Sequence, residues 1–224
     1  MLSTYTMRYI VGDIEIRAEN TAKPMENAAA PLVHWLNERN YVNAALDYGC
    51  GKLRYTKYIA MKCTSLGVVD SRIQLNRVQH IDGQISTIEE YVKMKWPKSK
   101  IYELENFWNG IGFSYDFILC ANVLSAIPSI KIRAKSLRAI YNALSSNGEL
   151  LVVNQHTNSY FSKMKSMPNT IKYLDGWITQ SRSSASYYGI LNKDLVIRLL
   201  KKYGFSIKDS WIEGQSNYVL ATCR

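Results

Sequence analysis

The sequence predicts an α/β fold in which a doubly wound, mostly parallel sheet of seven strands is covered by helices on both faces and ends in a C-terminal antiparallel hairpin. Three observations predict it. Short apolar runs alternate with amphipathic segments from residue 43 onward. Two of the runs end in acidic residues or glycines, as ligand-binding parallel strands do. The chain closes with two alternating segments. Its 224 residues accommodate one such domain.

The first 42 residues are expected to form an arm that packs on this domain. Alternating apolar residues on either side of Gly12 and Asp13 predict a short hairpin. Apolar side chains at helical spacing then predict a helix over 24–40. The main domain is therefore expected over 43–224.

The core alternates strands and helices, which is the pattern of a parallel sheet. The strands are predicted at 43–48, 65–70, 100–104, 115–121 and 148–155, with helices at 53–62, 73–79, 85–93 and 130–144. The Ser-Ser-Asn-Gly sequence over 145–148 predicts a turn after the last of these helices. A helix over 192–203 then leads into the C-terminal hairpin, whose strands join at 213–216.

Residues 155–191 form a stretch without regular periodicity that is too long for a simple connection, so a lid over the end of the sheet is expected. Aromatic side chains in the lid suit a planar or cationic small molecule or a stacked base. These residues are Tyr160, Phe161, Tyr173, Trp177, Tyr187 and Tyr188. The alternative is that the rings only anchor the lid to the domain.

The composition is that of an ordinary globular protein, because 47% of the residues are hydrophobic and 21% are charged. No apolar run approaches the roughly 18 residues of a membrane-spanning helix, and the N-terminus lacks the pattern of a secretion signal. The cysteines show neither CxxC nor metal-ligand spacing, so reduced thiols, a cytoplasmic location and no bound metal or membrane are expected. They are Cys50, Cys63, Cys120 and Cys223.

The net charge of +10 favours a polyanionic partner only where the charge is concentrated. Within 117–174 the only acid is Glu149. Basic residues on the helix predicted over 130–144 lie opposite its apolar side, and they are interpreted as a solvated helix face. They are Lys131, Arg133, Lys135 and Arg138.

The first core strand ends in the sequence LDYGCGK over 46–52. Its two glycines allow a sharp turn and a close approach of the backbone to a ligand. The helix that follows offers free N–H groups and the positive end of its dipole. The second strand ends at Asp70, where a carboxylate can accept hydrogen bonds from both ribose hydroxyls. A cofactor that contains a nucleoside is therefore predicted.

With these motifs in this order, the chain resembles the class I S-adenosylmethionine-dependent methyltransferases from about residue 43 to the C-terminus. The matching parts are DYGCG, VVDSR, YDFILCANVL, LSSNGELLVV and the closing hairpin after GF. The resemblance implies a Rossmann-like fold, S-adenosyl-L-methionine as cofactor, and methyl transfer by direct displacement. One departure is Leu53, which stands where the family has a third glycine.

The resemblance also implies a set of cofactor contacts. Asp47 would lie near the amino group of the methionine moiety, Asp70 would hold the ribose, and the segment after the third strand would contact adenine. An alternative for Glu105 and Asn106 in that segment is that they only solvate a loop, and the Cys120 thiol is expected to pack rather than react. The implied set is Asp47, Gly49, Cys50, Gly51, Asp70, Ser71, Glu105, Asn106, Cys120 and Ala121.

Direct displacement depends mainly on alignment, so a general base is optional. The candidates for catalytic residues are His156, Asn122 and Tyr160, and the lid adds Asp175, Tyr187 and Tyr188 as titratable groups.

A small-molecule acceptor is expected, because the chain has neither a separate nucleic-acid domain nor the Pro-Pro-Tyr motif of the amino-methylating DNA enzymes. RNA or DNA methylation is the alternative, and binding would then depend strongly on salt. A further alternative is a cofactor-binding protein without activity. A dinucleotide-binding protein ranks last, because Arg54 occupies the sixth position of the GxGxxG turn. A monomer or a homodimer is expected.

Overall fold

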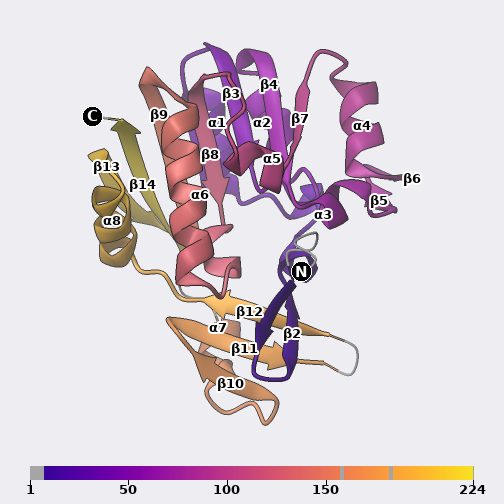
Figure 1. Cartoon of the computed structure of the whole chain (residues 1–224), viewed down its shortest axis with the longest axis vertical. Helices are drawn as coiled ribbons and strands as arrows, with labels where there is room; N and C mark the ends of the chain where they lie inside the picture. The colour runs from indigo at the N-terminus through magenta and orange to yellow at the C-terminus, as the bar shows by residue number, and fades with distance from the viewer. Residues whose placement is uncertain (1–7, 157–158, 182–183, 224) are drawn as a thin grey trace.

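The core of the protein is a seven-stranded sheet, seen in a computed structural model that describes residues 8–156, 159–181 and 184–223. Its strands are β3 (Val42–Tyr48), β4 (Cys63–Asp70), β7 (Lys100–Glu103), β8 (Tyr115–Ala121), β9 (Leu144–Gln155), β13 (Phe205–Glu213) and β14 (Ser216–Cys223). They are ordered β13-β14-β9-β8-β3-β4-β7 (Figure 1). The five strands from β9 to β7 are parallel, and β14 pairs antiparallel with both β9 and β13. The predicted fold class is confirmed.

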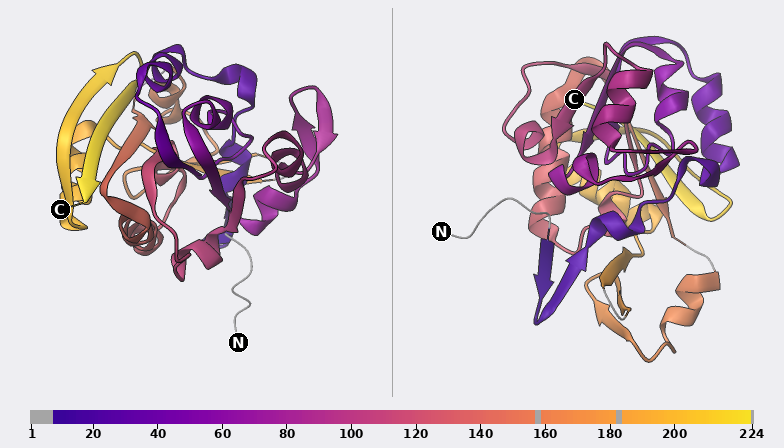
Figure 2. Two further views of the ribbon diagram at one scale, coloured as in Figure 1. Left: turned by 90° about the horizontal axis from the view of Figure 1, so that it is seen from above. Right: turned by 90° about the vertical axis from the view of Figure 1, so that its right-hand side faces the viewer.

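Helices cover both faces of this sheet (Figures 1 and 2). One face carries α5 (Leu104–Trp108), α6 (Ile130–Ala143) and α8 (Lys193–Lys202), and the other carries α1 (Ala30–Glu38), α2 (Thr56–Ala60), α3 (Arg72–Asn76) and α4 (Ile88–Lys95). Each helix buries an apolar stripe, as Leu137 and Ile140 do on α6 and Leu32 and Leu36 do on α1. Among the described helices, none is both long enough and apolar enough to cross a membrane.

The order of the strands determines where a ligand can bind. From β3 the chain adds β4 and then β7 on one side, and later adds β8 and β9 on the other. The carboxyl ends of β3 and β8 therefore flank a switch point, and open parallel sheets bind ligands in the crevice outside such a point.

The lid, residues 155–191, is more regular than its sequence suggests. It contains α7 (Ser159–Met164), β10 (Thr170–Tyr173), β11 (Gly176–Gln180) and β12 (Ala185–Gly189). Ala185 of β12 pairs in parallel with Ile16 of β2 (Ile14–Arg17), which forms a hairpin with β1 (Arg8–Val11). The result is a sheet of order β1-β2-β12-β11-β10, here termed the lid sheet, that lies below the core in Figure 1. The N-terminal hairpin and the lid therefore belong to one layer.

Local details also differ from expectation. The helix expected over 24–40 begins only at Ala30, after the 3-10 turns η1 (Ala18–Thr21) and η2 (Met25–Asn27), because Pro31 is tolerated only in the first turn of a helix. Instead of a single helix over 85–93, the strands β5 (Gln79–Ile81) and β6 (Gln84–Ser86) pair ahead of α4.

The segments expected at 53–62 and 145–148 are also corrected. The helix is restricted to α2, because the glycine turn continues as far as Tyr55. The Ser-Ser-Asn-Gly segment is not a separate turn but lies inside β9, where the pairing with β8 changes register between Tyr115 and Phe117.

Candidate functional site

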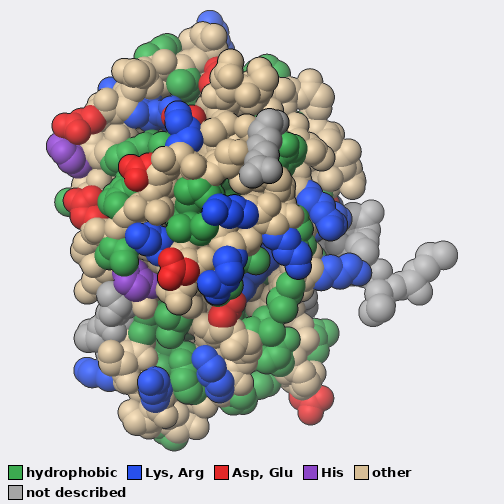
Figure 3. Space-filling model, turned by 90° about the vertical axis from the view of Figure 1, so that its left-hand side faces the viewer, with side chains coloured by type: hydrophobic (Ala, Val, Ile, Leu, Met, Phe, Trp, Pro, Cys, Tyr) green, Lys and Arg blue, Asp and Glu red, His purple; other side chains and the backbone are tan. Residues whose placement is uncertain are grey.

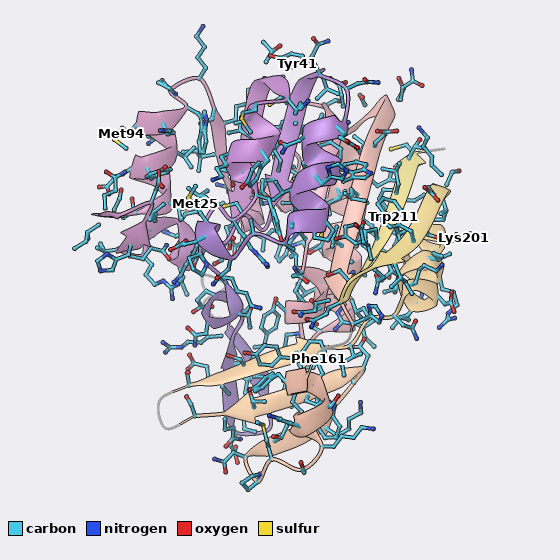
Figure 4. The ribbon with its side chains drawn as sticks, turned by 180° about the vertical axis from the view of Figure 1, so that it is seen from behind. Met25, Tyr41, Met94, Phe161, Lys201 and Trp211 are labelled. Carbon is cyan, nitrogen blue, oxygen red and sulfur yellow. The ribbon has the colours of Figure 1, made fainter. Side chains whose placement is uncertain are left out.

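A cavity of about 360 Å3 lies at the carboxyl ends of the core strands, between the core and the lid sheet. This volume falls within the range of sites that bind small molecules, about 300–1,000 Å3. Its wall comes from η1, the turn after β3, the ends of β4 and β8, and the lid. In Figure 4 the labelled Phe161, one of the lining residues, lies in the lid below the core strands.

The turn after β3 forms one side of the cavity. Gly49 and Gly51 have φ angles of 74° and 56°, in the left-handed region that favours glycine. The N–H groups of Gly49 and Cys50 both donate to the carbonyl of Val69, at 2.8 and 3.0 Å, which ties the turn to β4. A Cβ atom at position 49 would lie 2.3 Å from Val123 Cγ2. The turn therefore requires glycine there for space as well as for conformation.

Leu53 stands at the position of the family's third glycine. Its φ of 60° shows that the backbone keeps the left-handed conformation, and its N–H donates to the Cys50 carbonyl at 2.8 Å. The side chain is completely buried in the cluster that contains Leu32 and Leu36. Burial of a leucine side chain contributes about 1.5–3 kcal/mol. This offsets backbone strain of about 1–3 kcal/mol.

Asp47, at the end of β3, is a buried acid with one strong partner. It is 3% exposed and lines the cavity, and Thr56 Oγ1 donates to its Oδ2 at 2.6 Å. Burial raises the pKa of Asp47 to about 7, the charge of Asp70 adds to the rise, and the Thr56 hydrogen bond opposes it. A cation in the cavity would favour its ionised form.

Asp70, at the end of β4, braces the glycine turn from the opposite side. Its Oδ2 accepts a hydrogen bond from the Gly51 N–H and its Oδ1 accepts one from the Ser71 N–H, each at 2.7 Å. Burial raises the pKa of Asp70 to about 6, although both N–H groups oppose the rise. Gln74 supports the same turn, because its Nε2 donates to the Gly51 carbonyl at 2.7 Å. The cavity thus holds two carboxylates at adjacent strand ends.

The end of β8 contributes Ala121 and Asn122 to the wall. Asn122 has a φ of 61°, its N–H donates to the Val153 carbonyl at 2.7 Å, and its Oδ1 accepts from the Gln155 N–H at 2.9 Å. The side chain therefore holds the ends of β8 and β9 together. Cys120 lies outside the cavity, completely buried, and burial raises the pKa of its thiol to about 12.

The structure brings most, but not all, of the sequence-predicted residues to this cavity. The predicted residues in its wall are Asp47, Gly49, Cys50, Gly51, Asp70, Ser71, Ala121, Asn122 and Tyr160. Glu105 and Asn106 lie on α5 outside it, and Leu104 lines it instead. His156 also lies outside, and its backbone N–H donates to the Gln215 carbonyl at 3.0 Å.

Sequence reasoning missed Tyr9 and Glu19, which line the cavity from the N-terminal arm. Glu19 lies in η1, within the polar stretch AENTAK, where nothing in the sequence distinguishes it from a solvated loop acid. The alternation that predicted the hairpin marks Tyr9 only as one of its apolar positions. Their placement follows from the pairing of β2 with β12, which joins segments far apart in the chain.

Arg133 corrects the interpretation of the basic helix face. It is 3% exposed, and its Nη1 and Nη2 both donate to the carboxylate of Asp175 in the lid, the second at 2.9 Å. Its Nε donates to the Ile127 carbonyl at 2.9 Å, and the Tyr187 hydroxyl donates to Asp175. Burial opposes ionisation of Asp175, but the hydrogen bonds from Arg133 and Tyr187 outweigh it and lower its pKa. This buried ion pair fastens the lid to α6 beside the cavity.

The other three basic residues of α6, Lys131, Lys135 and Arg138, are exposed, as a solvated face requires. Figure 3 shows Lys and Arg side chains spread over one side of the molecule with Asp and Glu between them.

Comparison with known proteins identifies a related protein and shows which solved structures share this fold. No family model matches the chain. The chain is 37% identical over 213 residues to the uncharacterized protein YmfD from Escherichia coli (strain K12), and the alignment covers 95% of both proteins. The chain belongs to the same family as YmfD.

Solved structures show the fold of this YmfD-family protein. An S-adenosylmethionine-dependent methyltransferase from Clostridium acetobutylicum ATCC 824 has a TM-score of 0.62 and 15% identity, and the match covers 91% of this chain and 94% of that one. The 1,6-didemethyltoxoflavin-N1-methyltransferase from Burkholderia thailandensis, solved with 1,6-didemethyltoxoflavin and S-adenosylhomocysteine, has a TM-score of 0.60 and 14% identity, over 87% and 78% of the two chains. The fold is that of the class I S-adenosylmethionine-dependent methyltransferases, and the predicted resemblance is confirmed at this level.

Proposed function

We propose that this YmfD-family protein is an S-adenosylmethionine-dependent methyltransferase that acts on a small molecule. The observation that carries the proposal is the pair of carboxylates, the buried Asp47 and the half-buried Asp70, that face one cavity at the switch point of a methyltransferase fold. Both have a raised pKa, because the cavity wall leaves their charge poorly solvated. A ligand that brings positive charge and hydroxyl donors would compensate both groups.

S-adenosyl-L-methionine fits these requirements. Asp70 uses one lone pair of each oxygen on a backbone N–H, so further lone pairs can accept the ribose hydroxyls. Asp47 would favour the ammonium group of the methionine moiety, and Gly49 and Gly51 would let the backbone approach the ligand closely. When bound, the cofactor supplies an activated methyl group on a sulfonium ion.

The protein's own residues would then hold and orient the cofactor and the acceptor and enclose them in the cavity. The core strand ends and the glycine turn form one half of the cavity wall, and the lid residues Tyr160, Phe161 and Tyr188 form part of the other half. The Arg133–Asp175 pair keeps this wall on the core. Asn122 acts by positioning the ends of β8 and β9, since its side-chain oxygen already accepts the Gln155 N–H. We therefore place alignment, not acid-base chemistry, at the centre of the mechanism.

A small acceptor is supported by the size of the site. The lid sheet and η1 both contribute to the cavity wall, which leaves a volume of about 360 Å3 for ligands. The free state of all four cysteines supports a reducing location such as the cytoplasm.

Calorimetry with S-adenosylhomocysteine tests the proposal. The wild type should bind it, and Asp70→Ala should weaken binding at least about tenfold, because charge-assisted hydrogen bonds contribute about 1.5–3 kcal/mol. Asp13→Ala is the matched control, because Asp13 is exposed in the hairpin turn outside the cavity. Binding of nicotinamide dinucleotides in place of S-adenosylhomocysteine would refute the proposal, and salt-dependent retention of RNA or DNA on a filter would favour the nucleic-acid alternative.

A further inference from the structure

Glu19 is a buried acid in the cavity wall without a protein partner. It lies in η1 and is 9% exposed. Among the described residues, none donates a hydrogen bond to its carboxylate or forms an ion pair with it. A buried carboxylate is destabilising unless it is paired. Because Glu19 lines the cavity, a ligand can supply the missing partner.

Glu19 interacts electrostatically with Asp70 at the core strand ends and with Tyr9 in the lid sheet. Its charge adds to the effect of burial in raising the pKa of Asp70, and it has the same effect on Tyr9, a residue of the lid sheet. Asp47 and Asp70 already provide the two carboxylates that the proposed cofactor needs. The Glu19 carboxylate is thus available to the second ligand, the methyl acceptor.

The lid side of the cavity wall is aromatic. The rings of Tyr160 and Phe161 lie 5.7 and 6.4 Å from that of Tyr188, centroid to centroid. Tyr9 and Tyr187 line the same half of the cavity. The faces of such rings attract cations, and this attraction strengthens where water is excluded.

Three of the described residues in the cavity wall are basic. Lys23, Lys52 and Arg54 come from the η1–η2 connection and from the glycine turn, and Arg54 Nε donates to the Asn27 carbonyl at 2.7 Å. Arg133, next to Tyr187, is neutralised by Asp175. The lid half therefore combines one unpaired negative charge with aromatic rings.

We infer that the lid half of the cavity binds an acceptor that carries an amine, held as its ammonium ion by Glu19 and enclosed by the rings of Tyr9, Tyr160 and Tyr188. This inference rests on the proposed function and names its substrate class. An alcohol could donate a hydrogen bond to Glu19 but would not supply a counter-ion, and a carboxylate would add a second negative charge to the cavity.

The test compares two probes of matched size, benzylammonium and benzyl alcohol, by calorimetry on the full chain with and without saturating S-adenosylhomocysteine. Benzylammonium should bind at least about tenfold more tightly, since an ion pair and cation–π contacts together exceed about 1.4 kcal/mol in a desolvated site. Glu19→Gln should reduce this preference at least about threefold, and the preference that remains is the part that the rings supply. Glu26→Gln, which changes an exposed acid outside the cavity, should retain the preference.

Equal binding of the two probes, or a preference that is unchanged in Glu19→Gln, would overturn the inference. So would a loss of S-adenosylhomocysteine binding in Glu19→Gln, because Glu19 would then be a cofactor ligand. A wild type that fails to bind S-adenosylhomocysteine but still prefers benzylammonium would instead overturn the proposed function alone. Circular dichroism of each variant checks that the fold is retained.

Discussion

The sharpest prediction concerns Asp47→Asn, which removes a buried charge and keeps an acceptor for the Thr56 hydroxyl. Burial raises the pKa of Asp47 from 3.8 to about 7. A folded-state pKa above the unfolded value means that this group's contribution to stability is fully present below about pH 4 and is lost as the pH rises through about 7. Near pH 8 the ionised carboxylate therefore destabilises the ligand-free protein.

The pKa shift sets the size of the effect. At about 1.36 kcal/mol per pKa unit, the upper limit for Asp47 is about 4 kcal/mol. Part of the shift comes from the charge of Asp70, so we expect Asp47→Asn to stabilise the ligand-free protein by about 2–4 kcal/mol near pH 8. For a chain of this length each kcal/mol changes Tm by about 2–4 °C, which gives a rise of about 4–16 °C.

Thermal unfolding near pH 8 and near pH 5 measures the effect, and calorimetry with S-adenosylhomocysteine measures its consequence. The gain in Tm should shrink near pH 5, where the wild-type carboxyl is mostly protonated. S-adenosylhomocysteine binding should weaken in the variant. The matched control is Asp116→Asn, because Asp116 accepts hydrogen bonds from the Ala44 N–H and the Ser145 hydroxyl outside the cavity and should give no such gain. A variant less stable than the wild type near pH 8, or a gain independent of pH, would refute the reasoning.

Three further predictions concern the lid and the turn. Asp175→Asn should destabilise the protein by about 3–5 kcal/mol in thermal unfolding, because it leaves Arg133 buried without its counter-ion. It should also speed hydrogen exchange in β11 and β12. Unchanged exchange in these strands would contradict the role of the Arg133–Asp175 pair in holding the lid on the core. Gly49→Ala should abolish S-adenosylhomocysteine binding. Adding Val123→Ala to this variant should restore part of the binding, because it removes the clash between the new Cβ and the Val123 side chain. If binding is not restored, the positive φ angle of residue 49 alone accounts for the loss. Leu53→Gly should lower Tm, with a net loss of stability of about 1–3 kcal/mol, although it relieves the backbone strain at residue 53. A higher Tm would mean that the backbone strain costs more than burial of the leucine side chain contributes.

The core sheet could be predicted because its signals are local. Each strand of the parallel sheet is a short apolar run, as in Tyr115–Ala121, and its position follows from the alternation with helices. The glycine turn and Asp70 are likewise adjacent to strand ends, so the sequence predicts that they meet, and the structure places them in one cavity. That they bind the cofactor stays a prediction.

The lid sheet could not be predicted because its pairing is not local. Ile16 and Ala185 meet across most of the chain, and strands of four or five residues with mixed aromatic and polar side chains carry little periodicity of their own. The role of Arg133 depends on Asp175, 42 positions away. On the helix pattern alone Arg133 is indistinguishable from Lys135, which is exposed.

The two halves of the cavity wall differ in how the chain brings their residues together: one is built from neighbouring strand ends and the other from strand pairing across the chain. The cofactor half rests on the ends of β3 and β4, which are buried from both faces and can change little without disturbing the core. The half that we propose for the acceptor rests on the lid sheet and on η1, which directly follows β2 and is therefore joined to β12 through the pairing of Ile16 and Ala185. We therefore expect the acceptor to be selected by residues that carry none of the cofactor's recognition.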